Sequence, residues 1–250
     1  GDVELQRLTP DTIQILYTRM LNRGLSARSV IGLHRPLRQA LSHAVRQGLL
    51  VRNPADAVQL PRPEKRQVQM WTAEETERFL VAASDAKYLQ FFQLLTLTGM
   101  RRSEAAGLKW RAVDFQESHL RVEATLQPIP GMGLVEGQPK TPKSRRSIAL
   151  SPATVELLHD IRGRQMENRL QVGDGWHNEA DYVFTRECGC PISPDQATRE
   201  FSRVVKETGF RKITLHGLRH AHASALLAKG VHPKVVSERL GHENIQITLD

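Results

Sequence analysis

The sequence has few of the features that would place a protein outside the cell or in a membrane. Only two cysteines, Cys188 and Cys190, occur among 250 residues. A pair one residue apart cannot hold a fold together by disulfides, so we expect a reducing, cytoplasmic setting. No apolar run approaches the roughly 20 residues of a membrane helix. The first residues also lack the basic and then apolar order of a signal peptide. We therefore expect a soluble protein without a membrane partner.

Carboxylate clusters suited to magnesium are also missing, whereas positive charge is in excess. The formal net charge is +8, which favours a polyanionic partner because phosphate contacts release counterions from nucleic acid. The first sixty residues hold eight arginines, four acidic residues and no lysine. A solvated helix face and a face that follows DNA phosphates both explain this pattern. The candidates for DNA contacts in this segment are Arg28, Arg35 and Arg38.

The pattern of helix starts and breakers predicts two domains. Residues 1–62 form a helical DNA-binding domain, since Thr9-Pro10 is a typical helix start and apolar residues follow at helical spacing. Prolines and charges make residues 63–70 a linker. Residues 71–250 form a second, larger domain.

The second domain combines helices with a few strands. Helical patterns occupy its beginning and its end. Between them, residues 119–123 and 147–150 alternate like strands on either side of a Gly/Pro-rich loop at 127–142. The expected fold is therefore mainly α with a small antiparallel β-sheet.

A set of basic residues in the second domain is suited to phosphate chemistry. His216 and Arg219 are three apart and share one helix face. Arg101 follows a buried helix directly, and His242 follows a glycine that ends a helix. Displacement at a phosphodiester gathers negative charge that fixed cations stabilise, while histidine moves protons near neutral pH. With Lys140, these residues form a predicted catalytic set that needs neither a metal nor another cofactor.

Zinc binding is the alternative interpretation of the histidines. His216 and His220 are four apart, as in some zinc sites. The segment lacks the glutamate of a His-Glu-x-x-His motif and has no obvious third ligand, so the sequence argues against zinc. Cys188 and Cys190 have no second pair of cysteines nearby and are expected to lie in a turn.

Four segments resemble the conserved boxes of the tyrosine recombinase (phage-type integrase) family. They follow the family's order and spacing: TGMRRSE at 98–104, KTPKSRR at 140–146, HGLRH at 216–220 and LGH at 240–242. One box alone is weakly diagnostic, whereas four in register are specific. Residues 9–60 also resemble the family's core-binding domain. The resemblance thus covers nearly the whole chain and implies a helical core-binding domain followed by a catalytic domain.

The resemblance implies a role for each matched residue. Arg101 and Arg219 would bind the scissile phosphate, and His242 would donate a hydrogen bond to a non-bridging oxygen. Lys140 would be the general acid for the 5′-hydroxyl leaving group. His216 would be an acid/base partner of the nucleophile.

Further residues of the same boxes would support this set. Glu104 would hold Arg101 in place from three residues away. Lys143 is an alternative to Lys140 as the general acid. The family pattern favours Lys140, because the family's lysine directly precedes a threonine. The DNA-binding residues of this segment would be Lys143, Arg145 and Arg146.

The nucleophile of the family is a tyrosine shortly after the last histidine box. This chain has only Tyr17, Tyr88 and Tyr182, and none holds that position. We therefore expect that the chain stops just before its nucleophile, with an N-terminal domain that is also incomplete. Such a chain would bind double-stranded DNA without cleaving it.

For the enzyme with its tyrosine, the resemblance implies site-specific recombination. One DNA strand would be cut and rejoined without metal through a 3′-phosphotyrosyl intermediate, in a homotetramer on synapsed DNA. A monomer is the alternative for this chain alone. Two other functions stay open: a type IB topoisomerase, which uses a similar cluster, and a non-catalytic DNA-binding relative. The complete basic set argues against the latter, because binding alone does not require it.

Overall fold

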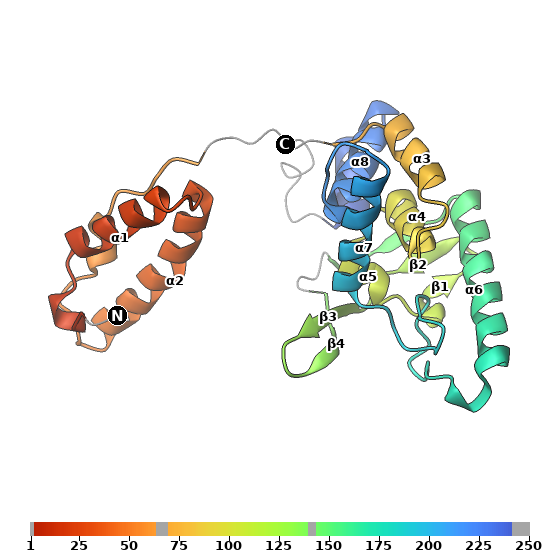
Figure 1. Cartoon of the computed structure of the whole chain (residues 1–250), viewed down its shortest axis with the longest axis horizontal. Coiled ribbons are helices and arrows are strands. Elements are labelled where there is room, and N and C mark those ends of the chain that lie inside the picture. The colour runs from red at the N-terminus through yellow and green to blue at the C-terminus, as the bar shows by residue number, and fades with distance from the viewer. Residues whose placement is uncertain (1–2, 64–69, 140–143, 242–250) are drawn as a thin grey trace. The chain divides into compact units, whose positions relative to one another are not determined.

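The computed structural model describes residues 3–63, 70–139 and 144–241. The chain forms two compact units, residues 1–68 and 69–250, and each is described by itself (Figure 1). Most of the expected linker lies outside the described residues.

The first unit is built on two helices, α1 (Pro10–Asn22) and α2 (Ala27–Arg46). Thr9 and Ser26 cap them, since each hydroxyl accepts a hydrogen bond from the backbone N–H three residues later. Short 3-10 helices at Leu5–Arg7 and Pro54–Ala57 precede and follow the pair. The buried core of this unit consists of Ile13, Tyr17, Val30, Leu41 and Ala55.

The second unit is mainly helical. Its helices in the described part are α3 (Ala73–Ala82), α4 (Leu89–Thr98), α5 (Arg102–Ala106), α6 (Pro152–Val172), α7 (Pro194–Glu207), α8 (Leu215–Ala228) and α9 (Pro233–Leu240). Thr72 and Glu75 form a capping box at the start of α3. Helix α4 is apolar and largely buried, and α3, α5, α6 and α8 all pack against it (Figure 1). The end of α4 is therefore a rigid place from which to present a functional side chain.

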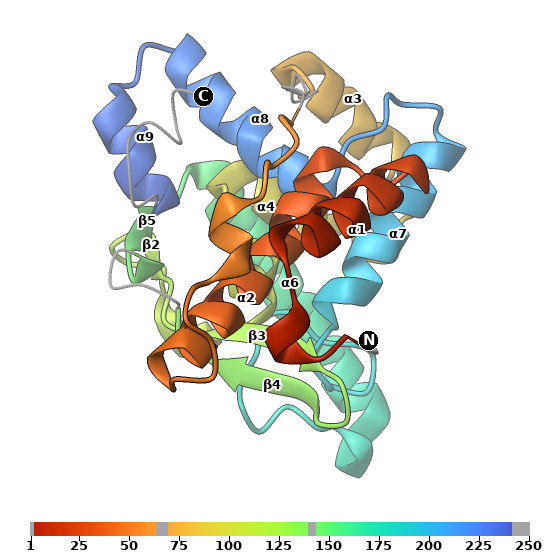
Figure 2. The same ribbon diagram turned by 90° about the vertical axis from the view of Figure 1, so that its left-hand side faces the viewer.

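Two small antiparallel sheets complete the second unit. The first has the order β1-β2-β5, formed by Val113–Asp114, His119–Arg121 and Ser147–Ala149, with Leu120 opposite both Val113 and Ile148. The second is a hairpin of β3 (Thr125–Ile129) and β4 (Gly133–Gly137), both labelled in Figure 2.

The hairpin corrects the expectation of a continuous loop at 127–142. Its turn is closed by a hydrogen bond of 3.0 Å from Met132 N to Ile129 O. Gly131 and Gly133 have φ of +79° and +77°, which glycine adopts at little cost. The glycines that suggested a loop therefore make a tight turn between strands.

The predicted fold class, mainly α with small antiparallel β structure, is confirmed. Within residues 3–63, 70–139 and 144–241, no helix has the length and apolar character needed to cross a membrane.

Candidate active site

The turn between α4 and α5 places Arg101 at the end of a buried helix. Gly99 ends α4 with φ of +66°, a conformation that side-chain-bearing residues rarely adopt. Crowding also demands glycine, because a Cβ here would lie 2.6 Å from Cδ2 of Leu240 and 2.7 Å from Cδ2 of His222. The turn that carries Arg101 is therefore packed directly against α8 and α9.

Glu104 holds Arg101 from the first turn of α5. Its Oε2 accepts a hydrogen bond from the Arg101 backbone N–H at 2.9 Å, and its Oε1 accepts one from Nη1 of Arg101 at 2.6 Å. The Glu104 side chain is only 1% exposed. These contacts fix both the backbone and the guanidinium of Arg101, as expected from the spacing of the two residues.

Arg146 approaches the same carboxylate from the start of β5. Its Nη1 and Nη2 donate to the two oxygens of Glu104 at 3.1 and 2.9 Å, which is the bidentate geometry of a strong arginine–carboxylate pair. Its Nε donates to the Arg239 carbonyl at 2.6 Å. The Arg146 side chain is 6% exposed. The structure thus corrects the expectation of a DNA contact: Arg146 is a buried partner of Glu104.

Arg219 reaches the same turn from α8. Its Nη1 donates to the Gly99 carbonyl at 2.6 Å and its Nη2 to the Leu240 carbonyl at 2.5 Å. The residue is 3% exposed. The predicted pair Arg101 and Arg219 is therefore brought to one turn, although the two residues are far apart in the sequence.

The end of α9 closes the site on the other side. Gly241 ends the helix in the left-handed region and accepts a hydrogen bond of 3.1 Å from Nη2 of Arg101. His242, the next residue in the sequence, lies outside the described residues, as do Lys140 and Lys143. Their predicted roles stay predictions.

Positive charge dominates this network. Within the described parts of the chain, the buried carboxylate of Glu104 is bonded to two guanidiniums, those of Arg101 and Arg146, and its charge also acts on Arg219. A fourth guanidinium, that of Arg239, is repelled by Arg146. Burial would raise the pKa of Glu104, but the hydrogen bonds and charges of Arg146 and then Arg101 lower it. Burial, followed by the charge of Arg101, lowers the pKa of Arg219 to about 9. A bound anion would relieve this repulsion, so the network is suited to a phosphate.

His216 lies beside these charges on α8. Part of its side chain is open to solvent, but neighbouring atoms desolvate the imidazole and lower its pKa to about 4, with further contributions from His220, Arg219 and Arg101. The His220 ring stands edge-on to it, at 4.9 Å between centroids. A neutral imidazole at neutral pH can accept or donate a proton. No group of three potential metal ligands occurs among residues 3–63, 70–139 and 144–241.

Arg239 and His222 also belong to the network, although neither was predicted as a site residue. Arg239 Nε donates to His222 Nε2 at 3.2 Å, and His222 Nδ1 donates to the Thr96 carbonyl at 2.8 Å. Their partners lie 17 to 142 residues away in the chain. No local pattern could therefore have identified this pair.

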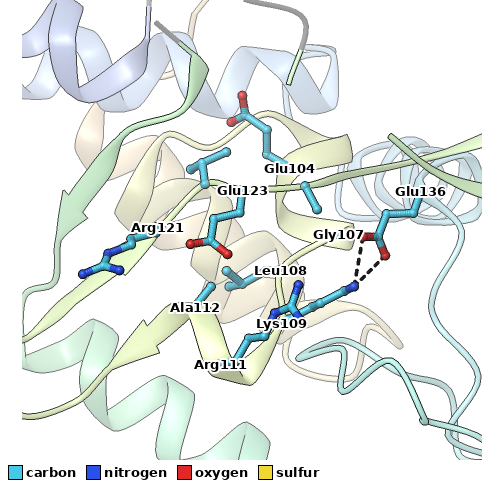
Figure 3. A pocket seen from close by; sticks show the side chains of 11 residues that line it. Glu104, Gly107, Leu108, Lys109, Arg111, Ala112, Arg121, Glu123 and Glu136 are labelled. Carbon is cyan, nitrogen blue, oxygen red and sulfur yellow. Dashed lines mark hydrogen bonds and ion pairs between the residues drawn. The ribbon is translucent and has the colours of Figure 1, made fainter. Parts of the chain in front are cut away.

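A small pocket that Glu104 helps to line contains a second set of charges (Figure 3). Lys109 Nζ contacts both oxygens of Glu136 at 2.7 and 2.9 Å. The Tyr182 hydroxyl, outside the pocket lining, donates to the same carboxylate at 2.7 Å. Burial, followed by the interaction with Glu136, raises the pKa of Tyr182. This group anchors strand β4 to the body of the unit.

The other expected DNA-binding arginines lie at the surface. Arg28 and Arg35 are exposed on α2. Arg38, on the same helix, pairs with Asp56 at 2.6 Å. Arg145 is exposed and donates to the Gln138 amide oxygen at 2.5 Å. These positions are compatible with phosphate contacts.

Comparison with known proteins gives the same assignment for most of the chain. The sequence profile of the phage integrase family matches residues 69–250. A tyrosine recombinase XerC-like protein of Caldanaerobacter subterraneus subsp. tengcongensis is 29% identical over 94% of this chain and 64% of its own length. The ICEBs1 integrase of Bacillus subtilis is 26% identical over 99% of this chain and 67% of its own length. The chain thus spans about two thirds of these relatives.

Solved structures show the same fold. The Tn1549 transposon integrase in complex with a circular intermediate DNA matches with a TM-score of 0.85 and 22% identity, over 100% of this chain and 82% of its own. A lambda integrase dimer bound to a COC′ core site matches with a TM-score of 0.72 and 20% identity, over 100% and 81%. The fold, the arginine network and the profile match together lead to one assignment: the chain belongs to the phage integrase family of tyrosine recombinases.

Proposed function

We propose that this chain supplies the core-binding and catalytic parts of a recombinase that cuts and rejoins DNA at specific sites. The supporting observation is the convergence of Arg101 and Arg219 on the turn at Gly99, with Glu104 as the one carboxylate of the described network. Two fixed guanidiniums beside a neutral imidazole suit a phosphodiester better than a neutral ligand. The guanidiniums provide the positive charge, so the proposed reaction uses no metal.

In the proposed reaction, a tyrosine oxygen attacks the scissile phosphorus and forms a 3′-phosphotyrosyl bond. The bond from phosphorus to the 5′-oxygen breaks, and Lys140 donates the proton that makes the 5′-hydroxyl. His242 and the two arginines stabilise the charge on the non-bridging oxygens, and His216 exchanges a proton with the nucleophile. The covalent bond conserves the energy needed for rejoining, so the cycle needs no ATP.

We propose that none of the chain's three tyrosines is the nucleophile. Tyr17 is buried in the first unit and bonded to His34. Tyr88 precedes α4, so the ten residues of that helix, roughly 15 Å, separate it from Gly99. Tyr182 is bonded to Glu136, and its raised pKa makes it a poor nucleophile. On this proposal, the 250-residue chain binds DNA but forms no covalent bond with it.

The proposed partner is double-stranded DNA in the cytoplasm, contacted by Arg28, Arg35, Arg38 and Arg145 at the surface and by Lys143. A lambda integrase tetramer bound to a Holliday junction has a TM-score of 0.74 to this chain. This likeness supports a homotetramer on synapsed DNA for the complete recombinase.

The test uses a duplex that the chain itself selects from a random-sequence pool. Each phosphate of that duplex is replaced in turn by an uncharged methylphosphonate, and binding is measured at fixed salt. We expect one position at which the replacement weakens binding about tenfold or more, because charge-assisted hydrogen bonds to that phosphate are lost. The variant Arg101→Ala should lose most of this sensitivity.

The matched control is Arg164→Ala, which removes an exposed arginine in the same groove as Tyr88. This variant should keep the wild-type sensitivity. Equal sensitivity in wild type and Arg101→Ala would contradict a phosphate contact by Arg101. A covalent adduct between the chain and the duplex on a denaturing gel would show that one of the three tyrosines attacks DNA.

A further inference from the structure

Three consecutive carbonyls at the end of α9 accept hydrogen bonds from three different arginines. The Arg239 carbonyl accepts from Arg146, the Leu240 carbonyl from Arg219 and the Gly241 carbonyl from Arg101. The last carbonyls of a helix lack partners within the helix and carry partial negative charge. The end of α9 therefore orients both guanidiniums that are proposed to bind the phosphate.

The apolar contacts that hold α9 are few. Among the described residues, its cluster has three buried members, Ala223, Val236 and Leu240, with Leu226, Leu227 and Val231 partly buried against them. Such a small cluster leaves the position of a short helix weakly determined, because burial free energy scales with the apolar area removed from water. Polar contacts must contribute to placing the carbonyls accurately.

The Arg239 side chain supplies such contacts from the last turn of α9. Its Nη1 donates to the Ala149 carbonyl of β5 at 3.0 Å, and its Nη2 donates to the Leu97 carbonyl of α4 at 3.4 Å. Its Nε donates to His222 Nε2 of α8 at 3.2 Å. One guanidinium thus joins the end of α9 to three separate elements of the unit.

His222 is an acceptor for Arg239 only while its ring is neutral. The Thr96 carbonyl can only accept, so His222 Nδ1 carries the proton and Nε2 is left as the acceptor. Burial, and then the charge of Arg239, lower the pKa of His222 to about 4. The ring is therefore neutral at the pH at which DNA would be bound.

We propose that Arg239, held by His222, is a positioning residue. It fixes the end of α9 so that the carbonyls of Leu240 and Gly241 direct Arg219 and Arg101 at one phosphate. This inference rests on the proposed phosphate contact, and it assigns no contact between Arg239 and DNA.

The test applies the methylphosphonate series to Arg239→Met, which keeps the apolar stem and removes the guanidinium. We expect the sensitivity at the critical phosphate to fall from about tenfold to less than about threefold, because misdirected arginines no longer distinguish a charged phosphate from a neutral one. Affinity for random duplex should stay within about twofold, since the surface contacts are unchanged. Arg239→Lys should recover part of the sensitivity.

His222→Phe provides a second variant that keeps the ring volume and removes the acceptor. Because His222 acts through Arg239, the double variant with Arg239→Met should lose no more sensitivity than Arg239→Met alone. Arg164→Ala is again the control, and sensitivities are compared below the melting temperature of each variant. A role in stability alone would lower that temperature and leave the sensitivity of the folded protein unchanged.

The outcomes separate the two proposals. If wild type shows no critical phosphate, the proposed function fails. If wild type shows one and Arg239→Met responds to it equally, the phosphate contact stands and the positioning role of Arg239 is overturned.

Discussion

The carboxylate of Glu104 and the guanidinium of Arg146 form a bidentate pair that is almost completely buried. Their two hydrogen bonds measure 2.9 and 3.1 Å, and the side chains are 1% and 6% exposed. The Glu104 carboxylate also holds Arg101. Its negative charge is thus balanced in part by Arg146, which lies 42 residues further along the chain, next to β5. The pair links the orientation of Arg101 to the packing of β5.

Replacing Glu104 by glutamine should destabilise the second unit strongly. Arg146 would keep its buried charge and lose its anionic partner, which typically costs roughly 3–5 kcal/mol. The control is Glu207→Gln in the exposed pair with Arg203, where the expected loss is below about 1 kcal/mol. Chemical denaturation followed by circular dichroism measures both. If Glu104→Gln lost no more unfolding free energy than the control, the buried pair would not have the predicted effect on stability.

The same variant should change the response to acid. The pKa of Glu104 in the folded protein lies below its ordinary value of 4.5, so its contribution to stability is present above that pH and is lost as pH falls through the folded pKa. The difference in unfolding free energy between wild type and Glu104→Gln should therefore shrink below about pH 4.5. A difference that stays constant from pH 7 to pH 3 would show that ionisation of Glu104 has no part in it.

Substitution of Gly99 by alanine should separate crowding from backbone strain. Gly99 and Gly209 both have positive φ, +66° and +72°, but an added Cβ meets nothing within 4 Å at Gly209. Alanine should cost about 1–2 kcal/mol at either position for the left-handed backbone. At Gly99 we expect roughly 1–3 kcal/mol more, because Leu240 and His222 must move. Thermal and chemical denaturation of both variants measure the difference, and equal losses would rule out the crowding.

Local signals in the sequence predicted much of the fold because helix starts depend on neighbouring residues. Thr9, Ser26 and Thr72 all cap helices through the backbone N–H three positions later. The β3–β4 hairpin was not predicted, because Pro128 and several glycines are poor strand residues, and the pairing depends on a tight turn. The pairing of such strands depends on contacts between the two strands, which the β-propensity of single residues does not describe.

The site was predictable in its charged groups and less so in their arrangement. The boxes around Arg101 and Arg219 identify the two residues, and the structure brings them to one turn. The sequence could not reveal that Arg146 faces inward while Arg145, its neighbour, is exposed. Arg146 faces inward because it pairs with Glu104. The two residues are 42 positions apart, so no local sequence pattern indicates the pair.

His216 should titrate near pH 4 in the free protein and at higher pH when DNA is bound. Its folded pKa of about 4 lies below the ordinary 6.5, so the unfolded chain binds more protons between these values and stability rises with pH across that window. A phosphate beside the ring would favour the imidazolium and raise the pKa. Titration of the His216 ring protons by NMR, with and without the selected duplex, measures this shift.

The same linkage predicts how binding depends on pH. If DNA raises the pKa of His216, binding takes up a proton and affinity should increase from pH 7 to pH 5. The increase should be smaller in His216→Gln. His177→Gln is the matched control. The His177 side chain is 61% exposed, and its backbone N–H donates to the carbonyl of Cys188, a residue outside the arginine network. The same pH dependence in all three proteins would contradict a phosphate beside His216.

Arg35 and Arg38 on α2 should differ in their contribution to DNA binding. Arg35 is exposed, whereas Arg38 is paired with Asp56 at 2.6 Å and must give up this partner to bind phosphate. Arg35→Ala should lower the slope of log affinity against log salt by about 1, as expected for one lost phosphate contact. Arg38→Ala should lower it by less. Asp56→Asn should raise affinity at low salt by releasing Arg38, and this gain should vanish in the double variant with Arg38→Ala. Equal slopes for wild type and Arg35→Ala would show that this face of α2 does not follow the DNA backbone.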